Sequence, residues 1–155
     1  MQPNGKKLDG YPDGSVKAEL TRDAVIAKYA AILSKEETPI LWEATEGDIN
    51  NINYKTITAA ASKGEAKVLE VLNSIIECIA ILINNISTVL FAKFVVLHGF
   101  FMNEWLFDYF KNYISDFCGE DIAKKIKISR AENKFEFTSG CAISIYEYFY
   151  KKGGI

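Results

Sequence analysis

Two glycines at predicted strand–helix turns are the positions in this chain where a phosphate group could be held most simply. Gly99 follows the apolar run at residues 94–97, and Gly140 precedes the last helical pattern of the chain. A glycine lets the backbone approach a ligand closely, and a helix N-terminus offers N–H groups to an anion. Tight-turn geometry explains a lone glycine equally well. Gly99 and Gly140 are therefore candidate nucleotide-binding turns, with a purely structural role as the alternative.

The other reactive side chains form no catalytic or metal-binding pattern. His98 is the single histidine, and neither a carboxylate nor a second histidine stands at matching spacing. Cys78, Cys118 and Cys141 are far apart and lack the paired spacing of a structural zinc site. An odd number of thiols, two of them in apolar helical context, is typical of a reducing cytoplasm. We expect no catalytic residue, no metal and no cofactor, and a cytoplasmic location.

The first half of the chain predicts short helices. Residues 1–14 are rich in glycine, proline and aspartate, which predicts a flexible N-terminal segment. Thr21 is a suitable N-cap for a helix that continues to about Leu33, and Pro39 suits the first position of a short helix. Another short helix is expected at residues 54–62.

The second half predicts alternating helices and strands. Apolar residues at helical spacing from Val68 to Ile86 indicate a helix of about twenty residues. The continuous apolar run at residues 93–97 is typical of a strand buried on both faces of a parallel or mixed sheet. An aromatic helix at 103–117, a turn at 121–125, a strand at 126–129 and a helix at 140–151 follow. This order predicts an α/β layered fold, with residues 15–155 as one domain.

The helix expected at residues 103–117 carries a stripe of large aromatic side chains, Trp105, Tyr109, Phe110 and Tyr113. A stripe at helical spacing indicates core or a subunit interface before it indicates a sugar-stacking surface. So much apolar surface on one short helix favours the interface. We therefore expect a homo-oligomer, with a dimer built on this helix.

Charge and hydropathy exclude two kinds of partner. The 155 residues carry a formal net charge of −2, so no basic face is available to neutralise a nucleic-acid backbone. Residues 75–101 are rich in apolar side chains, but Glu77 and Lys93 interrupt them, and no run of about 18–20 apolar residues remains. We expect neither direct nucleic-acid contact nor a membrane span.

The order of several short motifs resembles the C-terminal half of the ROK family, which comprises sugar kinases and sugar-responsive repressors. Residues 59–65, Ala-Ala-Ala-Ser-Lys-Gly-Glu, match the family's Ala-Ala-x-x-Gly-Asp junction before a long helix. Residues 95–99 match its strand ending in Gly-Gly, and residues 140–142 match its Gly-Ala-Ala step into a final helix. The resemblance implies the C-terminal lobe of the actin-like, ribonuclease H-like sugar kinase superfold.

Three departures from the family pattern favour a regulator over a kinase. Residues 1–17 lack the family's zinc-binding cysteines, and His98 replaces the first glycine of the Gly-Gly pair. Lys17 stands where the family aims a carboxylate at the sugar, and an ammonium group accepts no hydrogen bond from a sugar hydroxyl.

The resemblance therefore implies the effector-sensing and oligomerisation lobe of a bacterial, ROK-type transcriptional regulator. A sugar or sugar phosphate would be the effector in the full-length protein, and the DNA-binding part would lie upstream of Met1. One alternative is the nucleotide-side lobe of a ROK sugar kinase, and another is a stand-alone interaction module. We expect the chain to be catalytically silent by itself.

Overall fold

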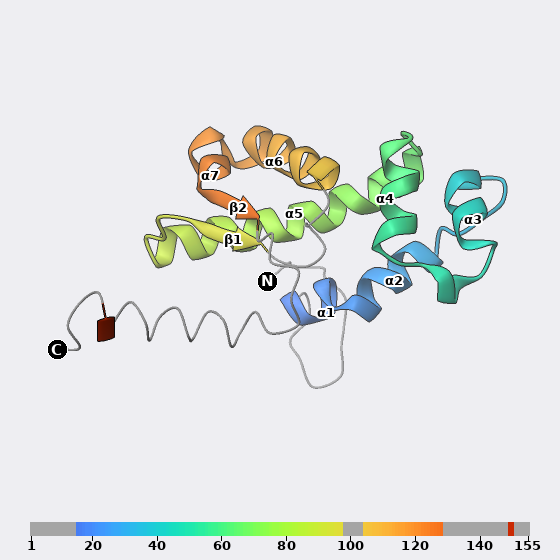
Figure 1. The fold of residues 1–155 in the computed structure, drawn as a ribbon, viewed down its shortest axis with the longest axis horizontal. Coiled ribbons are helices and arrows are strands. Elements are labelled where there is room, and N and C mark those ends of the chain that lie inside the picture. The colour runs from blue at the N-terminus through green and yellow to red at the C-terminus, as the bar shows by residue number, and fades with distance from the viewer. Residues whose placement is uncertain (1–14, 98–103, 129–148, 151–155) are drawn as a thin grey trace.

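The computed structural model describes residues 15–97, 104–128 and 149–150, and 73% of these residues are helical. Helix α5 runs through the body, with α6 and α7 along one side and α1 and α2 along the other (Figure 1). The helices are α1 Val16–Leu20, α2 Arg22–Ala30, α3 Pro39–Thr45, the 3-10 helix η1 Ile49–Asn51, α4 Tyr54–Ser62, α5 Ala66–Val89, α6 Glu104–Cys118 and α7 Glu120–Lys125. The strands are β1 Val95–Leu97 and β2 Ile126–Ile128.

The prediction of an α/β lobe of the actin-like, ribonuclease H-like superfold is wrong. Two three-residue strands, paired in parallel with Val95 opposite Ile126, make up the sheet of the described residues. The apolar run that predicted a strand buried on both faces is largely exposed, since Phe94 is 62% and Val96 53% accessible. Its apolar character therefore reflects surface rather than a central strand, and helices form the bulk of the core.

Several helices lie where the sequence predicts them. Thr21 caps α2 by accepting a hydrogen bond from the Ala24 N–H at 3.3 Å, and Pro39 occupies the first turn of α3. Helix α4 covers the residues expected of it. The turn expected at residues 121–125 is instead α7, which begins after Gly119 at a φ of 90°. The expected N-terminal segment and the helix at 140–151 lie outside the described residues, apart from Phe149 and Tyr150.

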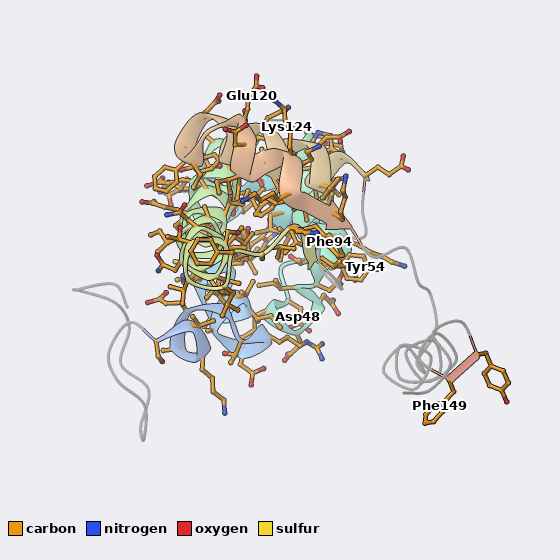
Figure 2. All side chains as sticks on the ribbon, turned by 90° about the vertical axis from the view of Figure 1, so that its left-hand side faces the viewer. Asp48, Tyr54, Phe94, Glu120, Lys124 and Phe149 are labelled. Carbon is orange, nitrogen blue, oxygen red and sulfur yellow. The ribbon has the colours of Figure 1, made fainter. Side chains whose placement is uncertain are left out.

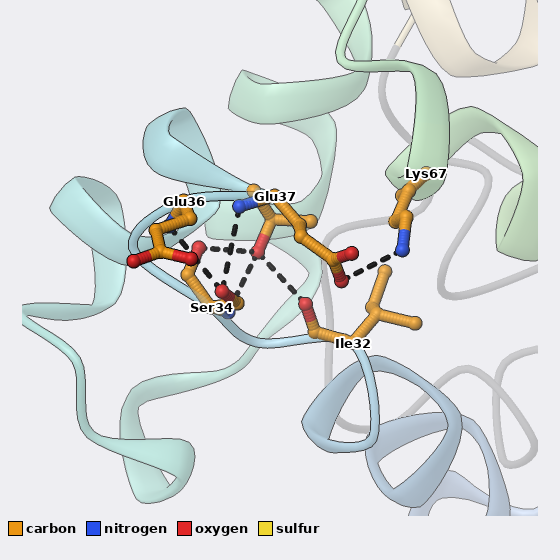
Figure 3. Close-up of polar contacts among 6 residues, drawn as sticks. Ile32, Ser34, Glu36, Glu37 and Lys67 are labelled. Atoms are coloured by element: carbon orange, nitrogen blue, oxygen red, sulfur yellow. Dashed lines mark hydrogen bonds and ion pairs between the residues drawn. The ribbon is translucent and has the colours of Figure 1, made fainter.

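The loop between α2 and α3 is fixed by hydroxyl groups (Figure 3). The buried Thr38 hydroxyl donates to the carbonyl oxygens of Ile32 and Ser34 and accepts from the Ser34 N–H at 2.9 Å. Glu37 pairs with Lys67 of α5 at 2.7 Å, with both side chains about half exposed. The loop is thereby closed on itself and joined to the start of α5.

One face of α5 forms the centre of the hydrophobic core. Its buried residues recur at the i, i+3, i+4 spacing of an amphipathic helix, and they meet α1, α2, α4 and α6. Leu106, Phe110 and Ile114 of α6 complete the opposite wall and are at most 1% exposed. The buried set on α5 is Val68, Leu72, Ile75, Ile76, Ala80, Ile83 and Ser87.

Tyr29 carries a polar group that this core does not satisfy. The residue is fully buried in α2, and its hydroxyl has no hydrogen-bond partner in the described structure. Burial raises the pKa of the phenol, because the phenolate would lose its hydration. The folded state therefore binds the proton more tightly than the unfolded chain does. This contribution to stability is complete below the unfolded pKa of about 10 and is lost as the pH rises further.

We expect Tyr29→Phe to raise the free energy of unfolding by about 1 kcal/mol at pH 7, since it removes an unsatisfied buried hydroxyl and leaves the ring in place. The gain should grow between pH 9 and 11, because phenylalanine does not ionise. Urea unfolding at pH 7, 9 and 11 measures both effects. A loss of more than about 1 kcal/mol at pH 7 would mean that the hydroxyl has a partner after all.

Candidate functional site

The two glycines predicted at nucleotide-binding turns, Gly99 and Gly140, lie outside the described residues, as do His98 and Cys141. Strand β1 is described up to Leu97 and therefore stops just before the first of them. Lys17, at the position where the family has a carboxylate, is an exposed residue of α1. The predicted nucleotide-binding turns are therefore not among the residues that the structure describes.

The junction at residues 59–65 has a structural role. Gly64 adopts a φ of 82° after α4, and Glu65 follows it as the first flanking residue of α5. The Glu65 side chain is buried, and its two carboxylate oxygens accept hydrogen bonds from the N–H groups of Ile40 at 2.7 Å and Leu41 at 3.0 Å. The acidic residue of this motif therefore caps α3.

The sequence of α3 explains why a distant carboxylate is needed there. Thr38 precedes the helix, but its hydroxyl is engaged by the preceding loop and makes no cap hydrogen bond. Pro39 has no N–H, and the Trp42 N–H bonds to the Thr38 carbonyl at 2.8 Å. Ile40 and Leu41 remain as orphan donors at the positive end of the helix dipole, where a carboxylate is favourable.

The aromatic stripe of α6 mainly serves packing inside the chain. Phe110 is fully buried, and Trp105, Tyr109 and Tyr113 are half-buried against the core. The Tyr109 hydroxyl donates to Asn73 Oδ1 on α5 at 2.8 Å, and its ring stacks on Trp105 with centroids 5.3 Å apart. The pKa of Tyr113 is raised by desolvation and by the negative charge of Glu77. Core packing, one of the two roles predicted for this stripe, therefore accounts for its contacts.

The thiols and carboxylates of the described residues form no group of three or more that could hold a metal ion. Cys78 and Cys118 are free of disulfides. The Cys118 thiol lies 4.0 Å from the Ala80 carbonyl oxygen, and desolvation raises its pKa. A raised pKa keeps the thiol protonated and disfavours a nucleophilic role.

The described surface carries a group of exposed apolar side chains, an apolar strip, where α5 meets β1. We define the apolar strip as Val89, Leu90, Phe91, Phe94 and Val96. These residues are 73%, 70%, 88%, 62% and 53% exposed, respectively. The strip lies at one end of the body in Figure 1, and Figure 2 views the molecule from that side with Phe94 labelled.

Phe91 is held in a conformation that its side chain disfavours. Helix α5 ends at Val89 and is capped by Leu90, whose N–H bonds to the Ile86 carbonyl at 2.9 Å, and Phe91 then adopts a φ of 49°. This left-handed position after a helix is usually glycine, because a side chain there costs about 1–2 kcal/mol. The most exposed side chain of the strip therefore occupies a strained position that glycine would fill more easily. Strain of this kind is concentrated at functional sites.

The strip continues onto strand β1. Among the described residues β1 pairs with β2 on one side, and no described strand pairs with its other edge. A strand edge without a partner strand can bind a further strand. Exposed apolar side chains of this kind are suited to protein–protein contact and supply no group for acid, base or nucleophilic chemistry.

The sequence contains a signal for this surface that the pattern rules misinterpret. Residues 86–97 hold one charged side chain, Lys93, and a run of this kind predicts burial. The run contains no glycine or proline to mark the turn after α5, so the reversal at Phe91 is invisible to turn rules. The high apolar content of residues 86–97, interrupted by one charged residue, is the sign of an interface that the sequence offers.

No helix among the described residues is long and apolar enough to cross a membrane. Comparison with known proteins found no matching family model, no matching curated protein and no matching solved structure.

Proposed function

We propose that this chain is a non-catalytic assembly lobe, which joins other protein subunits through the apolar strip at the α5–β1 junction. The observation that carries the proposal is the exposure of five large apolar side chains within eight consecutive positions, with Phe91 88% exposed. Leaving such side chains in water costs the hydrophobic stabilisation that burial would give, about 25 cal/mol for each Å². A partner surface would recover it.

We further propose that the lobe belongs to a sugar-responsive transcriptional regulator of the ROK type and contributes to effector sensing there. Support comes from the order of the sequence motifs at residues 59–65, 95–99 and 140–142. The superfold is no part of the proposal. A sugar or sugar phosphate bound between this lobe and another part of the protein would shift the population of a DNA-binding arrangement.

The coding sequence before the codon for Met1 tests the regulator assignment. An in-frame winged helix-turn-helix would support it, whereas an Asp-x-Gly-x-Thr phosphate loop without that domain would favour the kinase alternative. If the upstream sequence encodes neither of them, the family assignment is contradicted and the assembly role alone remains.

A phosphoryl-transfer assay on the chain itself tests the absence of catalysis. With ATP and either glucose or N-acetylglucosamine, we expect no sugar phosphate above the background of a protein-free control. Measurable turnover by the chain would overturn the non-catalytic part of the proposal. The assay does not depend on the oligomeric state of the chain.

A further inference from the structure

We infer that the occupant of the apolar strip is a second copy of this chain, joined in a two-fold symmetric dimer with Phe91 at its centre. This inference rests on the assembly role proposed above and names its partner. Surface area, charge and the geometry of β1 lead to it.

The size of the strip fits one half of a stable dimer interface. With on the order of 200 Å² for each fully exposed phenylalanine and about 150 Å² for each fully exposed valine or leucine, the observed exposures give a strip on the order of 600 Å². This is the upper end of the range for the largest apolar patch of a monomer, about 300–600 Å². Two strips in contact would bury on the order of 1,200 Å², which is the lower end for specific interfaces.

The charge distribution of the strip suits contact with itself. Residues 78–103 contain no aspartate or glutamate, and Lys93 is the one lysine or arginine among them. A two-fold interface places the same patch on both sides, so a patch of neutral apolar groups meets its own complement without opposing charges. Lys127, the cross-strand partner of Val96, also adjoins the strip. Lys93 and Lys127 are both exposed and can keep their ammonium groups in water at the rim.

Other occupants fit this surface less well. A membrane surface attracts apolar helices that also carry many lysines or arginines, whereas the basic side chains beside the strip are Lys93 and Lys127, in a chain with a net charge of −2. A charged peptide would find at most these two lysines to pair with along the strip. Among the described residues no strand pairs with the second edge of β1, and a two-fold axis beside that edge would bring another β1 alongside.

Phe91 is the expected anchor of the dimer. It is the most exposed of the strip residues, and its neighbours Leu90 and Phe94 would surround it on both copies. Large aromatic side chains at the centre of an interface supply most of its binding energy. The strain at its positive φ is then offset in the assembled state.

Sedimentation equilibrium of the full chain tests this inference. We expect a reversible dimer at micromolar concentrations, with a dissociation constant that changes less than about threefold between 0.05 and 0.5 M NaCl, because no ion pair contributes. Phe91→Asn should weaken the dimer about 30-fold or more. Asparagine tolerates the left-handed conformation, so the variant should keep its fold.

Ile49→Asn is the matched control, since Ile49 is an apolar residue 53% exposed in η1, which lies between α3 and α4 in the chain. Figure 1 shows α3 and α4 at the other end of the body from the α5–β1 junction. Ile49→Asn should change the dissociation constant less than about twofold. Val89→Lys is a second strip variant: a lysine in the last turn suits the helix dipole and sets like charges against each other in the dimer. It should weaken dimerisation even if Phe91→Asn fails to fold.

Three results would overturn the inference. The first is a chain that stays monomeric up to about 500 µM, a concentration at which a contact of this area should be populated. The second is an equal weakening by Ile49→Asn. The third is a monomer that binds vesicles of phosphatidylcholine and phosphatidylserine through Phe91, which would assign the strip to a membrane surface. If the chain is a monomer but its gene encodes an upstream winged helix-turn-helix, the regulator assignment stands and the dimer does not. If the chain is a dimer but its gene encodes no such domain, the dimer stands and the regulator assignment does not.

Discussion

Glu65→Ala is expected to lower the free energy of unfolding by about 3–4 kcal/mol, because one buried and one partly buried N–H group lose a charged acceptor at once. The N–H groups of Ile40 and Leu41 point at the Glu65 carboxylate from the first turn of α3. Neither has another helical acceptor, since the first N–H groups of a helix have none. Urea unfolding followed by the fluorescence of Trp42, which lies in α3, measures the loss.

Two variants separate capping from general electrostatics. Glu65→Gln keeps the length of the side chain and one oxygen acceptor, so it should lose about half as much stability as Glu65→Ala. Glu37→Ala removes a carboxylate from the exposed ion pair with Lys67, close to the same junction, and should cost at most about 0.5 kcal/mol. Equal losses for Glu65→Ala and Glu37→Ala would contradict the capping role.

The Glu65 contact also shows what the sequence could and could not predict. The sequence predicts the positions of α3 and α4 in the chain accurately, because Pro39 and the segment 54–62 carry local signals for helix ends and helical faces. The partners of the Glu65 carboxylate, Ile40 and Leu41, are 25 and 24 residues away in the sequence, and no local rule pairs residues so far apart. The acidic residue before the long helix was noticed as a family motif, whereas its role as a cap became visible in three dimensions.

The fold class failed for a related reason. Residues 93–97 satisfy the pattern of a buried strand, yet the pattern reports apolar character and not what covers it. In the structure two short strands pair beside a long helix, and the five strip residues are exposed while Val95 between them packs against the core. The candidate site therefore lies in the segment whose pattern predicts a buried strand. A run of large apolar residues with neither glycine nor proline is compatible both with a buried strand and with an exposed interface.

Phe110→Ala should destabilise the chain by about 3–5 kcal/mol, the cost of a cavity left by a fully buried phenylalanine. Phe117→Ala provides a matched control on the same helix, α6, where the phenylalanine is 49% exposed and stacks on Tyr113 at 6.2 Å. It should cost about 1 kcal/mol or less. Urea unfolding followed by tryptophan fluorescence compares the two variants at several protein concentrations.

This pair of variants also decides between the two roles predicted for the aromatic helix. If α6 packs inside the chain, the difference between Phe110→Ala and Phe117→Ala is the same at every protein concentration, because folding of a monomer core is unimolecular. If the outer face of α6 joined subunits, the stability lost in Phe117→Ala would increase with protein concentration, since association adds to stability by mass action. The hydrogen bond from Tyr109 to Asn73 holds α6 to α5 within one chain, so we expect no such dependence. A concentration-dependent loss for Phe117→Ala would move the dimer face from the apolar strip to α6.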